Sequence, residues 1–304
     1  MRNYKPKEFA GMIGVAVITL QRWDNAGTLK AFRTPTNRRF YTSEQYDKYM
    51  REVRAGVISS AEETTDASEE ELLDLEQYRR SPNRGAGASL PKRCYSSPQG
   101  EIYFKFGMTD NEICAELFAY YLAGQLGINA ACTKLAKSGS VLGVASYDIG
   151  DYAEPSDEKS YSVKDYTSIE GFVFMCLFDY LIMNEDRHAG NWGIAGNKVA
   201  ALFDHNYAFG GPDAITDADN FMRMVTSPFY ADNENDQRHD SLLLYFVKRH
   251  PKEVSSFMDK LNHIREVSNA LWRKHFPDDC RRLNSLLKKR ILYMREKVGE
   301  YSAK

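Results

Sequence analysis

Met183-Asn-Glu-Asp-Arg-His-Ala-Gly-Asn-Trp-Gly193 is the stretch around which the rest of this sequence is organised. It places Asp186 five residues before Asn191, and Leu202-Phe-Asp-His-Asn206 then adds the carboxylate of Asp204. Carboxylate and amide oxygens are ligands that Mg²⁺ prefers, and a carboxylate also accepts a proton from a hydroxyl group. Each of these polar residues alone would be an ordinary turn residue, but together they predict a metal-dependent catalytic site.

Apolar segments flank this loop on both sides. Residues 171–183 are typical of a buried helix that carries the loop, and residues 198–203 of a buried strand that delivers Asp204. The spacing of the aspartate and the asparagine is that of a protein-kinase catalytic loop. We therefore predict a phosphotransferase in which Asp186 accepts the hydroxyl proton, while Asn191 and Asp204 bind Mg²⁺.

The string Asp-Arg-His-x-x-Asn within 186–191, followed by Phe203-Asp-His-Asn206, resembles the HipA-like serine/threonine kinases, whose metal motif lacks the usual Phe-Gly. Lipid kinases of the phosphatidylinositol type share the same order. The loop therefore indicates an atypical kinase and leaves the choice between the two groups to other parts of the sequence.

A glycine-containing segment, Gly85-Ala-Gly-Ala-Ser-Leu-Pro-Lys92, precedes an expected strand over 101–106. Glycines let backbone N–H groups approach phosphates closely, and a lysine in mid-strand between aromatic residues needs a charged partner. The segment resembles the HipA-like nucleotide loop, and Glu116 matches the glutamate that pairs with the strand lysine. The resemblance implies that these residues bind ATP: Gly87, Ser89, Lys92, Lys105, Glu116 and, as adenine contacts beside the hinge strand, Tyr147 and Ile149.

Composition restricts the class of protein. The chain has 304 residues, of which 43% are hydrophobic, so one large and one small domain can be packed. We find no apolar run of membrane-spanning length and no signal peptide, and we expect a cytoplasmic protein without a membrane partner. Five cysteines without a close pair favour reduced thiols over disulfides or a zinc site.

The first part of the chain is basic. Residues 1–55 contain eleven Lys or Arg against five Asp or Glu, whereas residues 60–80 contain eight acids against two arginines. Apolar spacing predicts a helix around Phe9, a second helix over 15–24 and then a basic wing over 29–41. Such a winged helix-turn-helix is typical of DNA binding, although a protein-binding helical module remains the alternative.

This segment resembles the winged helix-turn-helix of MerR-type regulators and of certain transposon-encoded recombinases and excisionases, above all in Leu20-Gln-Arg-Trp-Asp24 and Arg33-Thr-Pro-Thr-Asn-Arg-Arg39. MerR regulators dimerise through a long helix, and the helix that we expect over 68–78 is short, so a homodimer is left open. The residues predicted to contact double-stranded DNA are Thr19, Gln21, Arg22, Arg33, Arg38 and Arg39.

The predicted fold class is α+β: a two-lobed atypical protein-kinase-like fold with a mostly helical C-lobe, preceded by a small winged helix-turn-helix domain. Helices are expected at Leu242–Lys248, Val254–Leu271 and Asp278–Val298, with Arg281, Arg282 and Lys288-Lys-Arg290 on a solvated face and His188 orienting the catalytic loop. The predicted domains are the DNA-binding domain (1–52), an acidic linker (53–82), the kinase N-lobe (83–150) and the kinase C-lobe (151–304).

The sequence thus predicts an ATP- and Mg²⁺-dependent serine/threonine protein kinase that carries its own DNA-binding domain. The resemblance further implies a protein substrate and a toxin of toxin-antitoxin type, or an autoregulated growth regulator, and leaves a separate antitoxin open. Two alternatives remain: a transcriptional or mobile-element regulator whose kinase fold only binds nucleotide, and a lipid or small-molecule kinase.

Overall fold

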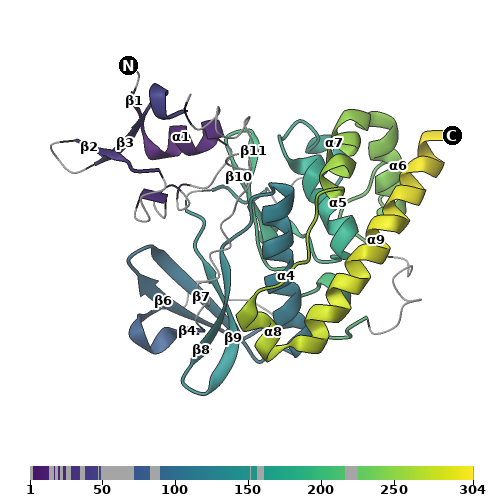
Figure 1. Ribbon diagram of the computed structural model, residues 1–304. Helices are drawn as coiled ribbons and strands as arrows, with labels where there is room; N and C mark the ends of the chain where they lie inside the picture. The colour runs from purple at the N-terminus through teal and green to yellow at the C-terminus, as the bar shows by residue number, and fades with distance from the viewer. Residues whose placement is uncertain are drawn as a thin grey trace. The chain divides into compact units, whose positions relative to one another are not determined.

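The computed structural model divides the chain into two compact units, residues 1–68 and 69–304 (Figure 1). Within the described part, no helix combines the length and the hydrophobicity needed to cross a membrane. The described residues are 3–13, 17, 20, 23–24, 29–34, 38–46, 48, 72–82, 90–150, 152–155, 161–215 and 225–303.

The smaller unit has the predicted helix and wing. Along the chain, helix α1 (Pro6–Ile13) follows strand β1 (Asn3–Tyr4) and precedes the wing strands β2 (Phe32–Arg33) and β3 (Arg39–Thr42). The three strands form one sheet with β3 at its centre. The described residues of the expected second helix include Leu20, which is buried in the same core. Ring stacking of Phe9 on Tyr41 at 4.7 Å joins the helix to the wing.

The larger unit begins with a six-stranded sheet. Its order is β4-β8-β9-β7-β6-β5, and all neighbours are antiparallel except β4 and β8. The strands are β4 (Leu73–Asp74), β5 (Arg79–Ser81), β6 (Lys92–Ser97), β7 (Gly100–Phe106), β8 (Thr133–Ser138) and β9 (Val141–Tyr147). Helix α4 (Asp110–Leu126) connects β7 to β8 and packs on the sheet.

Two strands of this sheet lie within the predicted linker, so the linker and the helix expected in it are wrong at their C-terminal end. The described residues at the end of the expected helix form β4 and the 3₁₀ helix η1 (Leu75–Gln77), and β5 follows. Strands β4 and β5 are the two opposite edges of the sheet. The apolar residues that suggested a helical stripe pack against the sheet instead, since Leu75 is buried beside Tyr95 and Ile102. The N-lobe therefore begins by residue 73, earlier than the predicted boundary at 83.

The second lobe is mostly helical, as predicted. Figure 1 shows the long helix α9 crossing this lobe, and α9 contacts α4, α5 and α6. The helices are α5 (Phe172–Ile182), α6 (His239–Arg249), α7 (Pro251–Leu261), α8 (Ala270–His275) and α9 (Pro277–Ala303). A hairpin of β10 (Trp192–Ala195) and β11 (Lys198–Leu202) follows α5.

One predicted helix is wrong. The expected helix Val254–Leu271 is divided, because α7 ends at Leu261 and α8 starts at Ala270 after a separate loop. Asn269 starts α8 as its N-cap, accepting a hydrogen bond from the backbone N–H of Trp272 at 2.7 Å.

The predicted helices at 242–248 and 278–298 are confirmed and longer than expected. The two-lobed α+β architecture is thereby confirmed.

Candidate active site

The loop predicted to be catalytic follows α5 directly. Met183 ends the helix in the left-handed conformation, with φ of 57°, and Asn184 turns back to donate to the side chain of Asp179 at 2.9 Å. Asp179 is buried within the apolar helix, where an unpaired carboxylate would be costly. The polar residue that interrupts the apolar run is thus the anchor of the loop.

Arg187 is the residue that organises this loop, a role that the sequence interpretation missed. Its side chain is fully buried, and two of its nitrogens donate to the two carboxylate oxygens of Asp179 at 3.0 and 2.9 Å. Its Nη1 donates to the backbone carbonyls of Asn191 at 2.6 Å and Phe203 at 2.9 Å. The planar guanidinium, with five donors, suits this task, and it holds helix, loop and the end of β11 together.

Asp186 and Asn191 lie side by side in the loop. The amide nitrogen of Asn191 donates to the carbonyl of Asp186 at 2.7 Å and lies 3.4 Å from its carboxylate oxygen. Burial raises the pKa of Asp186, and the nearby carboxylate of Asp204 reinforces this rise. The carboxylate is therefore a stronger proton acceptor than an ordinary aspartate.

His188 lies next to this pair. Its ring nitrogen Nδ1 accepts a hydrogen bond from the backbone N–H of Gly190 at 3.0 Å, capping the 3₁₀ helix η3 (Ala189–Asn191). Asn191 is the last residue of this turn, so the contact agrees with the predicted orienting role of His188.

Asp204 follows the end of β11 in a strained conformation. Its φ is 59°, in the left-handed region that a residue with a side chain adopts at a cost of about 1 kcal/mol or more. One carboxylate oxygen lies 2.7 Å from Nζ of Lys105, and the other lies 3.7 Å from Nζ of Lys92. Burial alone would raise the pKa of Asp204, but the charge of Lys105 outweighs it and lowers the pKa, so the group stays ionised.

Lys105 and Glu116 form a buried ion pair between β7 and α4, as the sequence predicts. Glu116 also accepts a hydrogen bond from the backbone N–H of His205 at 2.9 Å. Burial would lower the pKa of Lys105, but Glu116 and Asp204 together outweigh it and raise the pKa. The buried ammonium group of Lys105 therefore links the sheet and α4 to the carboxylate of Asp204, the predicted metal ligand.

Lys92 lies opposite Lys105 on the neighbouring strand. The two residues are directly paired between β6 and β7, so their side chains leave the same face of the sheet. Their ammonium groups approach different oxygens of Asp204. Two positive charges thus converge where the resemblance placed ATP phosphates.

The structure does not bring every predicted nucleotide contact to this point. Tyr147 is paired with Ile102 on the sheet face opposite Lys105, which is paired with Val144. Burial, with Tyr78 nearby, raises the pKa of Tyr147 to about 12. Its side chain therefore belongs to the small cluster under the other face, and Ile149 is half-buried in the loop that follows. Gly87 and Ser89 lie outside the described residues.

Of the predicted DNA contacts, three can be placed. Arg33 and Arg39 both donate to the carboxylate of Asp24, at 2.8 and 2.6 Å, so they tie the wing to the expected second helix. Arg38 is exposed on the wing, where its backbone N–H donates to Thr34 at 3.0 Å. Beyond these three, Thr19, Gln21 and Arg22 lie outside the described residues.

The oxygen donors of the loop fit Mg²⁺ better than a transition metal. No three His, Cys, Asp or Glu side chains converge on one metal position in the described part of the chain. Mg²⁺ commonly binds through one or two protein oxygens together with substrate phosphates, and Asp204 with Asn191 supplies such a set. The amide nitrogen of Asn191 is engaged with Asp186, which leaves its oxygen as the ligand atom.

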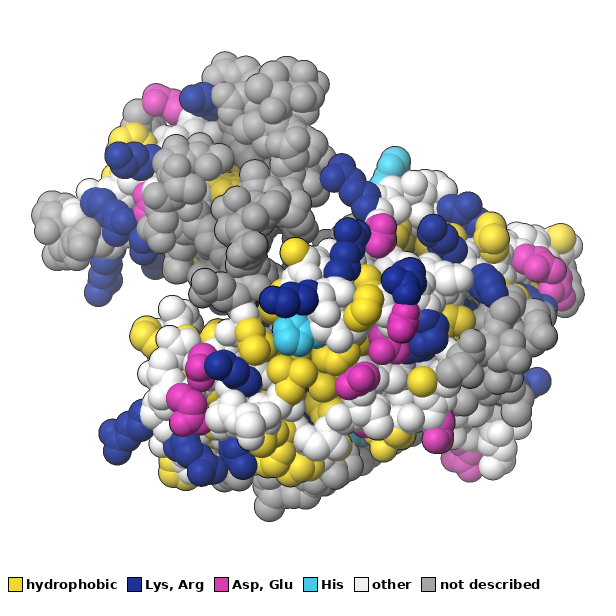
Figure 2. All heavy atoms as spheres, turned by 60° about the horizontal axis from the view of Figure 1, so that its bottom comes forward, with side chains coloured by type: hydrophobic (Ala, Val, Ile, Leu, Met, Phe, Trp, Pro, Cys, Tyr) yellow, Lys and Arg dark blue, Asp and Glu magenta, His cyan; other side chains and the backbone are white. Residues whose placement is uncertain are grey.

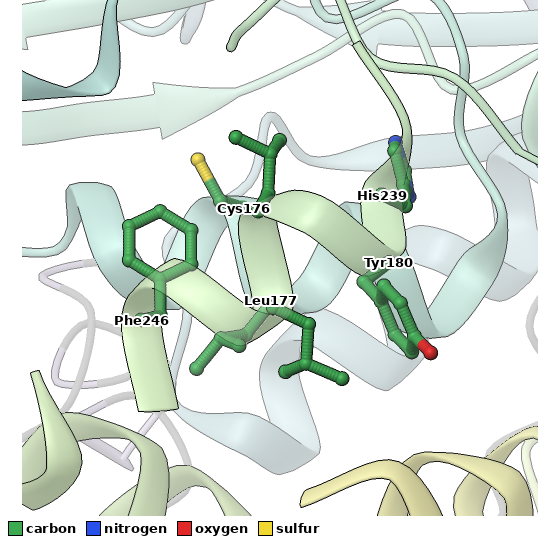
Figure 3. Close-up of a pocket in the computed structure, with 7 residues that line it drawn as sticks. Cys176, Leu177, Tyr180, His239 and Phe246 are labelled. Atoms are coloured by element: carbon green, nitrogen blue, oxygen red, sulfur yellow. The ribbon is translucent and has the colours of Figure 1, made fainter. Parts of the chain in front are cut away.

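A small cavity lies elsewhere, between α5 and α6. Figure 3 shows five of its lining residues, of which Cys176, Leu177 and Tyr180 belong to α5 and His239 and Phe246 to α6. Its walls are mainly apolar, and none of the predicted site residues lines it. We therefore assign the candidate active site to the loop around Asp186 and not to this cavity.

Comparison with known proteins agrees with both halves of the structure. Residues 4–50 match the family model of MerR HTH family regulatory proteins. The Helicobacter pylori proinflammatory kinase CtkA has a similar structure, with a TM-score of 0.58 and 18% identity over 76% of this chain and 99% of that one. A Shewanella oneidensis MR-1 toxin-antitoxin complex of HipA, HipB and operator DNA gives a TM-score of 0.43 and 10% identity over 85% of this chain and 72% of that one. No curated protein matched the sequence. The chain therefore combines a MerR-type helix-turn-helix segment with a domain of kinase-like fold.

Proposed function

We propose that the larger unit is an ATP- and Mg²⁺-dependent kinase that phosphorylates serine or threonine hydroxyls of proteins. The observation that carries the proposal is the position of Lys105, whose ammonium group contacts both Glu116 and Asp204. A buried lysine between two carboxylates is a costly arrangement to keep for stability alone. Beside a strained Asp204 and the Asp186–Asn191 pair, it is the expected arrangement for positioning a nucleoside triphosphate.

Each residue then has a task in the transfer. Lys105 and Lys92 neutralise phosphate charge, while Asp204 and Asn191 would hold Mg²⁺, which neutralises charge on the transferred group when bound. Asp186 accepts the proton of the acceptor hydroxyl, and its raised pKa suits that role. Arg187 keeps Asn191 and the end of β11 at a fixed separation, so the two metal-binding oxygens are placed before any ligand arrives.

We also propose that the smaller unit binds duplex DNA. Figure 2 shows Lys and Arg side chains gathered on its described surface, whereas the visible face of the larger unit mixes both signs of charge. The exposed basic residues include Lys30, Arg33 and Arg38 on the wing. Contacts of this kind neutralise phosphates and make affinity strongly dependent on salt.

Calorimetric titration of the full chain with ATP, with and without Mg²⁺, tests the kinase proposal. We expect Asp204→Asn to weaken Mg²⁺-dependent binding by at least about tenfold, because it removes a metal ligand and a partner of Lys105. Asp186→Asn should leave binding nearly intact while turnover is lost. The control is Asp259→Asn, which makes the same change at an exposed position on α7. Binding that ignores Mg²⁺ in the wild type would contradict the proposal.

A further inference from the structure

The segment from Asp204 to Ile215 follows a strained path. Besides Asp204, the buried aromatic residue Phe209 has a positive φ, of 53°, and Gly210 and Gly211 continue in the same region at 95° and 57°. A bulky residue there is a conformational outlier that persists only when its surroundings impose it. Contacts outside the segment must therefore hold it in place.

Helix α4 supplies the first set of these contacts. Glu116 accepts from His205, and Glu112, which also caps the helix through Thr109, accepts from the side chain of Asn206 at 3.4 Å. The ring of Phe118 meets Phe209 edge-on with 5.2 Å between ring centres. Successive turns of α4 therefore contact the segment that contains Asp204.

Asn111, at the start of α4, makes the contact farthest along the segment. Its amide nitrogen donates to the carbonyl of Gly211, and its amide oxygen accepts from Arg282 of α9. Arg282 also donates to the carbonyl of Ile215 at 3.0 Å and to Asp279 at 2.6 Å. Arg282 and Asn111 therefore hold both ends of residues 211–215 from two different helices.

This arrangement corrects the predicted solvated face, to which the buried Arg290 does not belong either. Arg281 does point to solvent, with 73% of its side chain exposed and an ion pair to Asp278. Arg282 is only 18% exposed. Successive residues on a helix point about 100° apart, so one arginine faces water while the next faces the segment.

We infer that Arg282, acting through Asn111 and the backbone of residues 211–215, is a positioning residue for Asp204. The inference rests on the proposed Mg²⁺-ATP function of Asp204. Without the arginine the strained path relaxes, and a smaller fraction of molecules has Asp204 directed at Lys105. The apparent affinity for Mg²⁺ falls by that fraction, since only the ordered form binds it well.

The test compares Arg282→Lys with Arg281→Lys in the full chain. Lysine keeps the charge, but its single ammonium cannot replace the planar set of donors that reaches Ile215, Asn111 and Asp279 together. Arg281→Lys makes the same chemical change on the neighbouring, exposed residue. Asn111→Asp is a second probe, because it keeps the acceptor for Arg282 and loses the donor to Gly211.

Hydrogen exchange without nucleotide is the first readout. The amides of Ala208, Gly211 and Ile215 are hydrogen-bonded within the segment, so their exchange reports its opening. We expect exchange at least about tenfold faster in Arg282→Lys and Asn111→Asp, no change in Arg281→Lys, and unchanged protection of α5 in all three. Equal exchange in Arg282→Lys and the wild type would overturn the inference.

The Mg²⁺ dependence of ATP binding is the second readout. The Mg²⁺ concentration at half-saturation should rise about tenfold in Arg282→Lys, with near-normal ATP binding restored by excess Mg²⁺. Faster exchange with an unchanged Mg²⁺ requirement would show a structural role only and would reject the positioning of Asp204. A wild type that binds no Mg²⁺-ATP would overturn the proposed function itself, whereas the exchange data would still decide whether Arg282 holds the segment.

Discussion

Arg187 and Asp179 form a buried ion pair in which two nitrogens of the arginine reach the two oxygens of the carboxylate, with 1% and 5% of the side chains exposed. The pair joins α5 to the loop that contains Asp186. Because the same guanidinium also reaches two backbone carbonyls, its loss removes the charged partner of a buried carboxylate, which keeps only the donor Asn184, and one donor from each carbonyl.

Removing this arginine should destabilise the larger unit strongly. We expect Arg187→Met to lower the free energy of unfolding by roughly 3–5 kcal/mol, the usual cost of breaking a buried pair. Arg273→Met removes an exposed pair with Glu266 and should cost less than about 1 kcal/mol. Denaturant unfolding of both variants measures the difference, and equal costs would contradict the role given to Arg187.

His239 should make stability depend on pH. Burial, with the charge of Arg290 nearby, lowers the pKa of His239 from 6.5 to about 3. Below pH 6.5 the unfolded chain therefore binds a proton at His239, whereas the folded chain does not bind it until about pH 3. The stability that is present above pH 6.5 is lost as the pH falls through this window. The loss is up to about 1.4 kcal/mol per pH unit.

The control for this effect is His239→Gln, which keeps a polar side chain without a titrating ring. The free energy of unfolding of this variant should fall less steeply between pH 6.5 and 4 than that of the wild type, as followed by denaturant titration at each pH. Parallel slopes for the two proteins would mean that His239 takes up its proton without resistance in the folded state.

Arg38 and Arg39 should separate DNA contact from folding of the smaller unit. Arg38→Ala is expected to reduce the slope of log affinity against log salt by about one with the fold unchanged, since its side chain is exposed. Arg39→Ala also removes a donor to Asp24 and should lower the unfolding temperature of this unit. Fluorescence anisotropy over a salt series, with Arg281→Ala as the control, measures the first effect. Binding that is absent or independent of salt would favour a protein-binding module instead.

Expression of the chain in a bacterial host should slow growth if the kinase acts as a toxin. Asp186→Ala removes the proposed proton acceptor and should restore growth, whereas repression of its own promoter should persist because groove binding does not use this residue. Growth curves and a promoter reporter, run on the same strains, test both points. Growth inhibition that survives Asp186→Ala would exclude toxicity through phosphoryl transfer.

The sequence predicted the parts of the site that depend on local spacing or on the cost of a buried charge. A lysine in the middle of a hydrophobic strand needs an acidic partner, and Glu116 on the next helix is that partner. The loop around Asp186 and the strand before Asp204 could likewise be predicted, because apolar segments of recognisable length mark them in the sequence.

Other parts could not be predicted because they depend on residues far apart in the chain. Arg187 binds backbone carbonyls, which leave no pattern in the sequence, and the role of Arg282 depends on which neighbour lies opposite one face of α9. The edge strand β4 pairs with β8, some sixty residues away, and its apolar residues fit a helical stripe equally well. Tyr147 is different, since the alternation of strand residues relative to Lys105 could have placed it on the opposite face.

Phosphoryl transfer from γ-labelled ATP to protein is the measurement that tests the central claim most directly. Wild-type chain, Asp186→Asn and Asp259→Asn are incubated with Mg²⁺, labelled ATP and a cell lysate, and label on protein is followed over time. We predict labelling by the wild type and by the exposed control Asp259→Asn, and a rate at least about a hundredfold lower for Asp186→Asn, the usual effect of losing a general base. Labelling by Asp186→Asn at the wild-type rate, or no Mg²⁺-dependent labelling by the wild type, would contradict the account.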